Sequence, residues 1–310
     1  MKLREWGAFG LLGLVWGSSF LWIKIAVQEV GPFVLVAFRL LFGLAGLVVV
    51  VLARRPRLPV ERRVWLMLGI LGLTNTFLPF SLISWGEQYI DSAVASILNG
   101  TVPLFTLVIA HLALHDDRIT PARVLGLVTG FVGVVILMIR DLGPDGFHGN
   151  LLGQGAVLLA AASYGGSAVF ARRNLRQVDS MAQAFVPLIG ADAAAWLMAL
   201  LVESPIALPR LSITWLALAW LGLLGSCAAY LLYFYLLHNI GPTRATTVTY
   251  VFPVVGVILG VAFLHEAADW HLVLGALLIA LGIGVVNWRP RAQATRAEGA
   301  GTPYAGRGAV

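Results

Sequence analysis

Charged residues are scarce in this chain. Asp, Glu, Lys and Arg make up 12% of its 310 residues, whereas soluble domains carry about 25%. Hydrophobic residues make up 59%, and the mean hydropathy is +0.87. Apolar runs of about 20 residues, long enough to cross a bilayer, recur along almost the whole length. The sequence therefore predicts a polytopic α-helical membrane protein rather than a soluble domain.

Cysteine is nearly absent as well. Cys227 is the single cysteine, so no internal disulfide can form. The first apolar run begins at Trp6 and is longer than the core of a secretory signal, and no Ala-x-Ala type site follows it. We therefore expect no cleaved leader.

The motifs of common enzymes are missing or incomplete. There is no Gly-x-Ser-x-Gly elbow and no phosphate-binding glycine-rich loop. The stretch "HEAAD" at His265 has Asp269 where a zinc-protease helix needs its second histidine. The stretch "GAD" at Asp192 resembles part of an aspartyl intramembrane protease, but a second mid-span aspartate is absent. We expect no catalytic residues, no metal and no cofactor; a lipid flippase or a membrane acyltransferase is the alternative.

Ten apolar spans are expected, in an all-α fold. They cover residues 6–27, 32–53, 64–84, 92–114, 121–139, 149–171, 181–202, 213–237, 242–264 and 270–288. If the N-terminus is cytoplasmic, 17 of the 21 Lys and Arg residues fall inside, and only Arg140 and Arg210 fall outside. This asymmetry predicts cytoplasmic N and C termini, with an even number of spans. It also explains the net charge of +6 without a nucleic-acid partner.

The two halves of the chain resemble each other at an offset of 150 residues. The stretch "WLMLGILGLTN" from Trp65 aligns with "WLALAWLGLLG" from Trp215, and Pro103 aligns with Pro253. After a one-residue slip, Gly126 and Gly133 align with Gly275 and Gly282. Each half holds five spans, so the second half enters the membrane inverted, the arrangement that supports alternating access in transporters. We expect repeats at 1–140 and 149–289 and a disordered cytoplasmic tail at 290–310.

Several stretches resemble a known family. They are "VWGSSFLWIK", the second-span pattern "P-F-V-L-V-A-F-R", and the closing "FLHEAADWHLVLGALLIALGIGVVN". Their order and spacing over residues 8–288 are similar to EamA-type transporters of the drug/metabolite transporter superfamily. The resemblance implies ten helices, a central cavity and transport of small metabolites, often the export of amino acids. It permits a monomer or a homodimer, and short loops with an Ala/Leu/Gly-rich composition suggest a bacterial inner membrane.

Two cations lie within the apolar spans. Lys24 is about four residues, or roughly 6 Å, from the outer end of its span, within reach of snorkelling to the interface. Arg39 is seven residues past Pro32, and a charge at that depth normally faces the bundle interior. Arg39, with Lys24, is predicted to hold a substrate carboxylate. Alternatively, Arg39 pairs with Glu29, Glu87 or Asp91 and locks an outer gate.

Other polar and aromatic residues within the spans are candidates to line the cavity. We expect substrate contacts from Trp16, Ser19, Asn75, Asn99, Tyr164 and Tyr230, with ordinary helix packing as the alternative for each. An aromatic, mostly uncharged lining suits a zwitterionic or aromatic amino acid. Asp192 is the acidic residue deep in a span and the candidate for proton coupling. Pro103 and Pro253 are predicted to kink equivalent spans, as hinges or as static bends.

Overall fold

The computed structural model describes residues 2–56, 58–113, 120–139, 149–240 and 246–287, all of whose regular elements are helices. The predicted tail at 290–310 lies outside the described residues. The first half contains α1 (Leu3–Gly17), α2 (Ser19–Ala26), α3 (Pro32–Arg54), α4 (Arg62–Gly72), η1 (Leu73–Phe77), α5 (Leu78–Gly86), α6 (Ser92–Asn99), α7 (Val102–Ala113) and α8 (Pro121–Ile139). The second half contains α9 (Gly149–Asn174), α10 (Ser180–Val202), α11 (Ser212–Ala219), η2 (Trp220–Ala228), α12 (Ala229–Ile240), η3 (Thr246–Tyr250), α14 (Val251–Leu264) and α15 (Trp270–Asn287).

These elements form ten apolar spans, because α1–α2, α4–η1–α5, α6–α7 and α11–η2–α12 each make up one span. Eight spans are long and apolar enough to cross a membrane, and Val248–Leu264 and Trp270–Val286 are two shorter apolar helices. The predicted ten-helix, all-α architecture is confirmed. Pro32 and Pro121 begin their helices, where the missing N–H costs no intrahelical bond.

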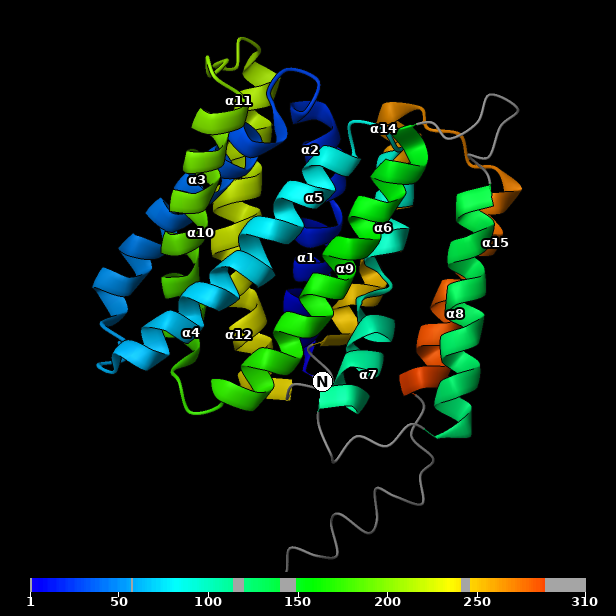
Figure 1. Ribbon diagram of the computed structural model, residues 1–310, viewed down its shortest axis with the longest axis horizontal. Coiled ribbons are helices and arrows are strands. Elements are labelled where there is room, and N and C mark those ends of the chain that lie inside the picture. Colours follow the sequence, from blue (N-terminus) through cyan, green and yellow to red (C-terminus); the bar gives the residue numbers. More distant parts are fainter. Residues whose placement is uncertain (1, 57, 114–119, 140–148, 241–245, 288–310) are drawn as a thin grey trace, which may run out of the picture.

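The N-terminus lies at one end of the bundle, at the bottom of Figure 1. The turns at 27–31, 87–91, 203–211 and 265–269 lie at the opposite end, which we call the distal end (Figure 1). The distribution of Lys and Arg predicts that the distal end faces the outside.

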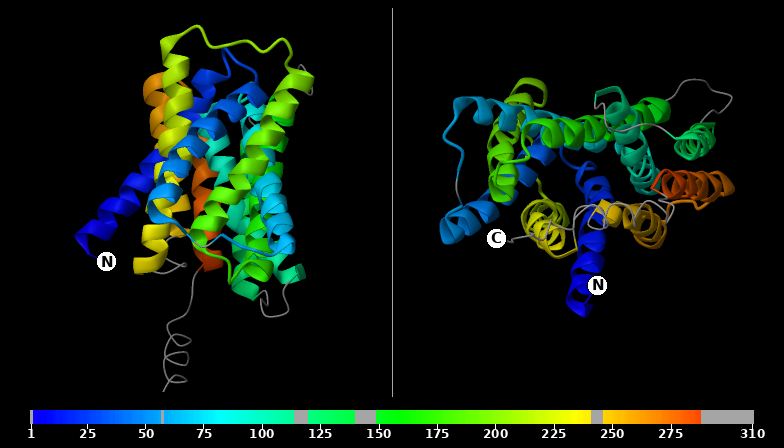
Figure 2. Two further views of the ribbon diagram at one scale, coloured as in Figure 1. Left: turned by 90° about the vertical axis from the view of Figure 1, so that its left-hand side faces the viewer. Right: turned by 90° about the horizontal axis from the view of Figure 1, so that it is seen from below.

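Close approaches between helices occur in pairs that the repeat relates. The Cβ position of Gly126 is 2.6 Å from the carbonyl oxygen of Gly282, and that of Gly133 is 2.7 Å from the carbonyl oxygen of Gly275. Gly126 aligns with Gly275 but contacts Gly282, and Gly133 aligns with Gly282 but contacts Gly275. The repeat therefore exchanges the two contacts. Contacts exchanged in this way are those of a two-fold axis. The axis brings α8 and α15 together at one edge of the bundle, as the right-hand view of Figure 2 shows.

A second such pair lies near the middle of the bundle. The Cβ position of Gly72 is 2.2 Å from the carbonyl oxygen of Pro187, and that of Gly222 is 2.7 Å from the carbonyl oxygen of Arg39. Gly72 and Gly222 are 150 residues apart, and each precedes or lies within a π-helical segment. A side chain at either glycine would force α3 or α10 away. The two halves are therefore built alike around these π-helical segments.

Pro103 and Pro253 lie near the starts of helices rather than in the middle of continuous ones. The fourth span breaks between Asn99 and Val102, so Pro103 is the second residue of α7. Pro253 is the third residue of α14, which follows the 3-10 segment η3. The Cβ position of Gly100 is 3.1 Å from Cγ of Pro253, so the two breaks face each other across the halves.

Candidate functional site

Arg39 lies in the core between the two halves. Its side chain is only 4% exposed, on the inner face of α3. Its guanidinium carbon lies 3.7 Å from the ring centroid of Phe80, a cation–π contact. Its Nε donates to Oγ of Ser226 at 3.4 Å. The predicted inward orientation of Arg39 is what the structure has.

No carboxylate pairs with Arg39 within the described part of the chain. The ionisable groups close enough to interact with it are Tyr164, Tyr230 and Glu87. The ion-pair alternative named Glu29, Glu87 and Asp91 as partners; Glu29 instead binds backbone and hydroxyl groups of the second half. A buried guanidinium with aromatic neighbours and unused donors is suited to an anionic group.

The surroundings of Arg39 combine equivalent positions of the two repeats. Phe80 and Tyr230 are 150 residues apart, as are Thr76 and Ser226. Phe80 lies against the guanidinium, Ser226 accepts from it, and Tyr230 interacts with both Arg39 and Thr76. Both π-helical segments thus contribute to one place, in keeping with the frequent location of π-bulges at functional sites. We call Arg39, Phe80, Tyr164, Ser226 and Tyr230 the Arg39 site.

Trp16 lies beside the Arg39 site. Its Nε1 donates to the carbonyl oxygen of Gly225 at 3.0 Å, an acceptor in η2. Its ring packs edge-on against Tyr230 and Phe252, at centroid distances of 6.3 and 5.7 Å. Ser19, one turn further along, is buried and donates to the carbonyl oxygen of Val15. The structure therefore brings together four of the predicted substrate-contact residues: Trp16, Arg39, Tyr164 and Tyr230.

Lys24 binds backbone carbonyls of another turn, a role that neither prediction for this residue included. Its Nζ donates to the backbone carbonyls of Glu87 at 2.7 Å and Ile90 at 2.8 Å. These carbonyls belong to the turn that follows α5, so Lys24 ties α2 to this turn at the distal end. Carbonyls at the end of a helix attract a cation.

The other predicted residues are spread through the bundle. Asn99 ends α6, is 9% exposed, and its Oδ1 accepts no hydrogen bond from any described residue. Asn75 lies half-buried in η1, next to Thr74, whose carbonyl accepts from Ser163 at 2.6 Å. Asp192 is half-buried on α10, beside Trp196, and not among the groups that interact with Arg39. Among the residues that the structure describes, no group of three His, Cys, Asp or Glu residues is placed to bind a metal.

Three carboxylates join the two halves at the distal end by binding helix N-termini of the opposite half. Glu203 accepts from the backbone N–H groups of Phe33 and Val34, at 2.9 and 2.8 Å. Glu266 accepts from those of Ser92 and Ala93, at 2.7 and 2.9 Å. A helix N-terminus carries unpaired N–H donors and a partial positive charge, so a carboxylate stabilises it.

The third carboxylate, Glu29, belongs to the first half and binds residues of the second half. It accepts from the backbone of Arg210 at 2.5 Å and of Leu211 at 3.1 Å, and from Oγ1 of Thr214 at 2.5 Å. The hydrogen bond from Thr214 is the main reason why the pKa of Glu29 is lowered. Carboxylates from both halves thus hold the distal ends of α3, α6 and α11 against the other half.

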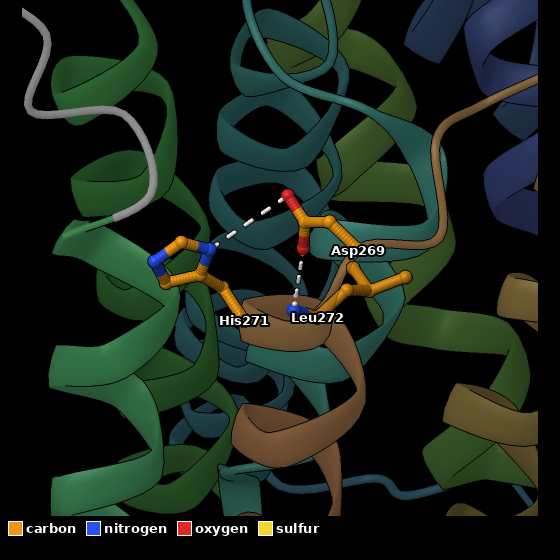
Figure 3. A network of polar contacts seen from close by, with 3 residues as sticks. All are labelled: Asp269, His271 and Leu272. Carbon is orange, nitrogen blue, oxygen red and sulfur yellow. Dashed lines mark hydrogen bonds and ion pairs between the residues drawn. The ribbon is translucent and has the colours of Figure 1, made fainter.

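The loop before α15 continues this polar surface. Oδ1 of Asp269 accepts from the backbone N–H of Leu272 at 2.9 Å, and Oδ2 lies 3.8 Å from Nδ1 of His271 (Figure 3). Asp269 therefore caps its own helix, whereas Glu266, three residues earlier, caps a helix of the other half. Sequence reasoning missed the role of Glu266. It also missed Phe80 and Ser226, which the 150-residue offset from Tyr230 and Thr76 could have revealed.

Comparison with known proteins agrees with this architecture. The profile of the EamA-like transporter family matches residues 6–139 and 151–288, one match per half. The chain is 28% identical to the uncharacterized transporter YoaV of Bacillus subtilis, over 87% of this chain and 92% of YoaV. It is 30% identical to the uncharacterized inner membrane transporter YedA of Escherichia coli K12, over 91% of this chain and 92% of YedA.

A solved crystal structure matches with a TM-score of 0.65 and 22% identity, over 92% of this chain and 96% of that one, which supports the fold alone. The two family matches cover nearly all of the ten-helix bundle, including every residue of the Arg39 site. The chain is a polytopic membrane transporter, not an enzyme, and belongs to the EamA-like transporter family.

Proposed function

We propose that this transporter exports neutral amino acids across a bacterial inner membrane by alternating access. The observation that carries the proposal is Arg39, a buried guanidinium with no carboxylate partner among the described residues, at the junction of the two halves. A guanidinium binds a carboxylate through two parallel hydrogen bonds, so an α-carboxylate would complete the site. The rings of Phe80, Tyr164 and Tyr230 suit the apolar part of an aromatic or aliphatic side chain.

The conformation supports alternating access. Arg39 is shielded from solvent, and the distal end is held shut by Glu29, Glu203 and Glu266. All three contacts join one half to the other, so they must break together when the distal end opens. The facing breaks at Pro103 and Pro253 are proposed as the hinges for this opening. We expect cytoplasmic termini, and a monomer suffices because both halves of the site come from one chain.

Counterflow in proteoliposomes tests the proposal. Vesicles preloaded with an unlabelled neutral amino acid should take up the labelled form transiently and saturably when diluted. Uptake that rises linearly with concentration, without trans-stimulation, would indicate a channel. If no member of an aromatic, aliphatic and small neutral panel exchanges, the amino-acid proposal is wrong, and other zwitterions or lipids become the candidates.

A further inference from the structure

Glu87 is a fully buried carboxylate at the distal end of the bundle. It follows α5 in the turn at the distal end, and it is 0% exposed. Neither of its carboxylate oxygens has a hydrogen-bond partner among the described residues. The buried hydroxyls of Ser84 and Ser92, three residues before it and five after it, also lack partners there. An ionised carboxylate is very unfavourable in such a place, whereas a protonated one is tolerated.

The charged groups that face Glu87 do not compensate for it. The ammonium of Lys24, on α2, donates hydrogen bonds to two backbone carbonyls rather than to the Glu87 carboxylate. Arg39 of α3 contacts Phe80 and Ser226 instead. Glu266, from the loop before α15, adds a negative charge nearby. Burial raises the pKa of Glu87 well above its ordinary value; Lys24 opposes this, Glu266 reinforces it, and Arg39 opposes it.

The segment from Glu87 to Ala93 makes several of the contacts that join helices at the distal end. Lys24 holds the carbonyls of Glu87 and Ile90, and Glu266 holds the N–H groups of Ser92 and Ala93. On the other side, the Cβ position of Gly86 is 2.8 Å from the carbonyl oxygen of Gly153 in α9. Glu87 can therefore reach water only if these contacts part. Once they part, the freed Lys24 ammonium becomes available to the carboxylate.

We propose that Glu87 binds a proton when the distal end closes and releases it when this end opens. The proton adds to one carboxylate oxygen from the distal solvent and returns there, or leaves toward the other side of the membrane within a transport cycle. The inference rests on the proposed alternating access, but not on the identity of the solute. It assigns to Glu87 the coupling role that the sequence predicted for Asp192, which is half-buried on α10.

A single thiol reports the opening of the distal end. Ser96 is fully buried on α6, and the Cβ position of Gly256 in α14 is 2.3 Å from its Oγ. We use Ser96→Cys in a Cys227→Ala background as the reporter, because residue 96 becomes accessible only when α6 and α14 separate. Labelling by a membrane-impermeant thiol reagent is measured across a pH series. Each rate is divided by that of the denatured protein at the same pH, which removes the titration of the thiol itself.

The expected result is a labelling rate that rises at least tenfold in the parent protein as pH increases from intermediate to high values. Glu87→Gln, an isosteric mimic of the neutral acid, should label slowly over this same pH range, and Asp192→Asn should behave like the parent. A Glu87→Gln protein whose labelling keeps the pH dependence of the parent would overturn the proposal. So would a parent whose labelling does not change with pH.

Infrared spectroscopy supplies a second test, which does not depend on the transport activity of any variant. The parent at neutral pH should show a protonated carboxyl C=O band that shifts in D₂O and is missing in Glu87→Gln but present in Asp192→Asn. If no band is lost in Glu87→Gln, Glu87 is ionised in the closed state and the proposal fails. Neither test involves a solute, so failure of amino-acid counterflow alone rejects the proposed function and leaves the proton site standing.

Discussion

Replacement of Glu266 by alanine removes the carboxylate that joins α6 to the second half. Two backbone donors lose their acceptor, the N–H groups of Ser92 and Ala93, whose residues are 0% and 1% exposed. A buried donor left without a partner costs about 1–3 kcal/mol. Glu266 itself is only half-buried, so water can approach and the low end applies, about 1 kcal/mol for each donor. The closed state should therefore lose ~2 kcal/mol relative to the open one, roughly a 30-fold shift in their ratio.

The cysteine reporter at position 96 measures this shift directly. When the closed state predominates, the labelling rate is proportional to the small open population, so Glu266→Ala should label roughly 30 times faster than the parent. Glu266→Gln keeps one acceptor oxygen but loses the charge, and it should lie between the two. Asp269→Asn is the matched control, because Asp269 lies in the same loop but caps its own helix. If Glu266→Ala and Asp269→Asn label within twofold of the parent, the carboxylate does not hold the distal end closed.

Three further predictions concern packing, the tie at Lys24 and pH. Gly133→Ala should lower the thermal stability of the detergent-solubilised protein, because the added Cβ would lie 2.7 Å from the carbonyl oxygen of Gly275; Gly155→Ala, with open space around it, should raise it slightly. Lys24→Met leaves two carbonyls without their donor and should speed labelling at position 96 about tenfold, and an unchanged rate would contradict the tie. Closure should be strongest at intermediate pH. Because the pKa of Glu87 is raised, its contribution to closure is complete at low pH and is lost as pH rises through that pKa. Because the pKa of Glu29 is lowered, its contribution to closure disappears as pH falls. Labelling that decreases monotonically with pH would contradict this.

The sequence was sufficient for the architecture because the bilayer leaves few alternatives. Apolar length predicts the spans, prolines predict helix starts, and the 150-residue offset predicts the inverted halves. The offset also carried information that was not used. It pairs Phe80 with Tyr230 and Thr76 with Ser226, and these residues surround Arg39.

Side-chain partners were harder to predict. The depth of Lys24 is compatible with snorkelling, yet its ammonium binds a turn more than 60 residues away in the chain. Glu203 and Glu266 lie in loops, where a carboxylate has no special meaning until the facing helix N-terminus is known. The sequence also predicted no π-helical segment, because each of the two lies inside a longer apolar span.

Counterflow by Arg39 variants is the measurement that tests the central claim most directly. In proteoliposomes matched for protein content, Arg39→Gln should abolish saturable counterflow of the amino acid that the parent transports. Arg39→Lys keeps the charge but loses the paired donors, and it should raise the half-saturating concentration about tenfold or more. Arg210→Gln, which removes an exposed cation at the distal end, should transport like the parent. Undiminished, saturable counterflow in a folded Arg39→Gln protein would contradict the assignment of Arg39 as the carboxylate-binding residue.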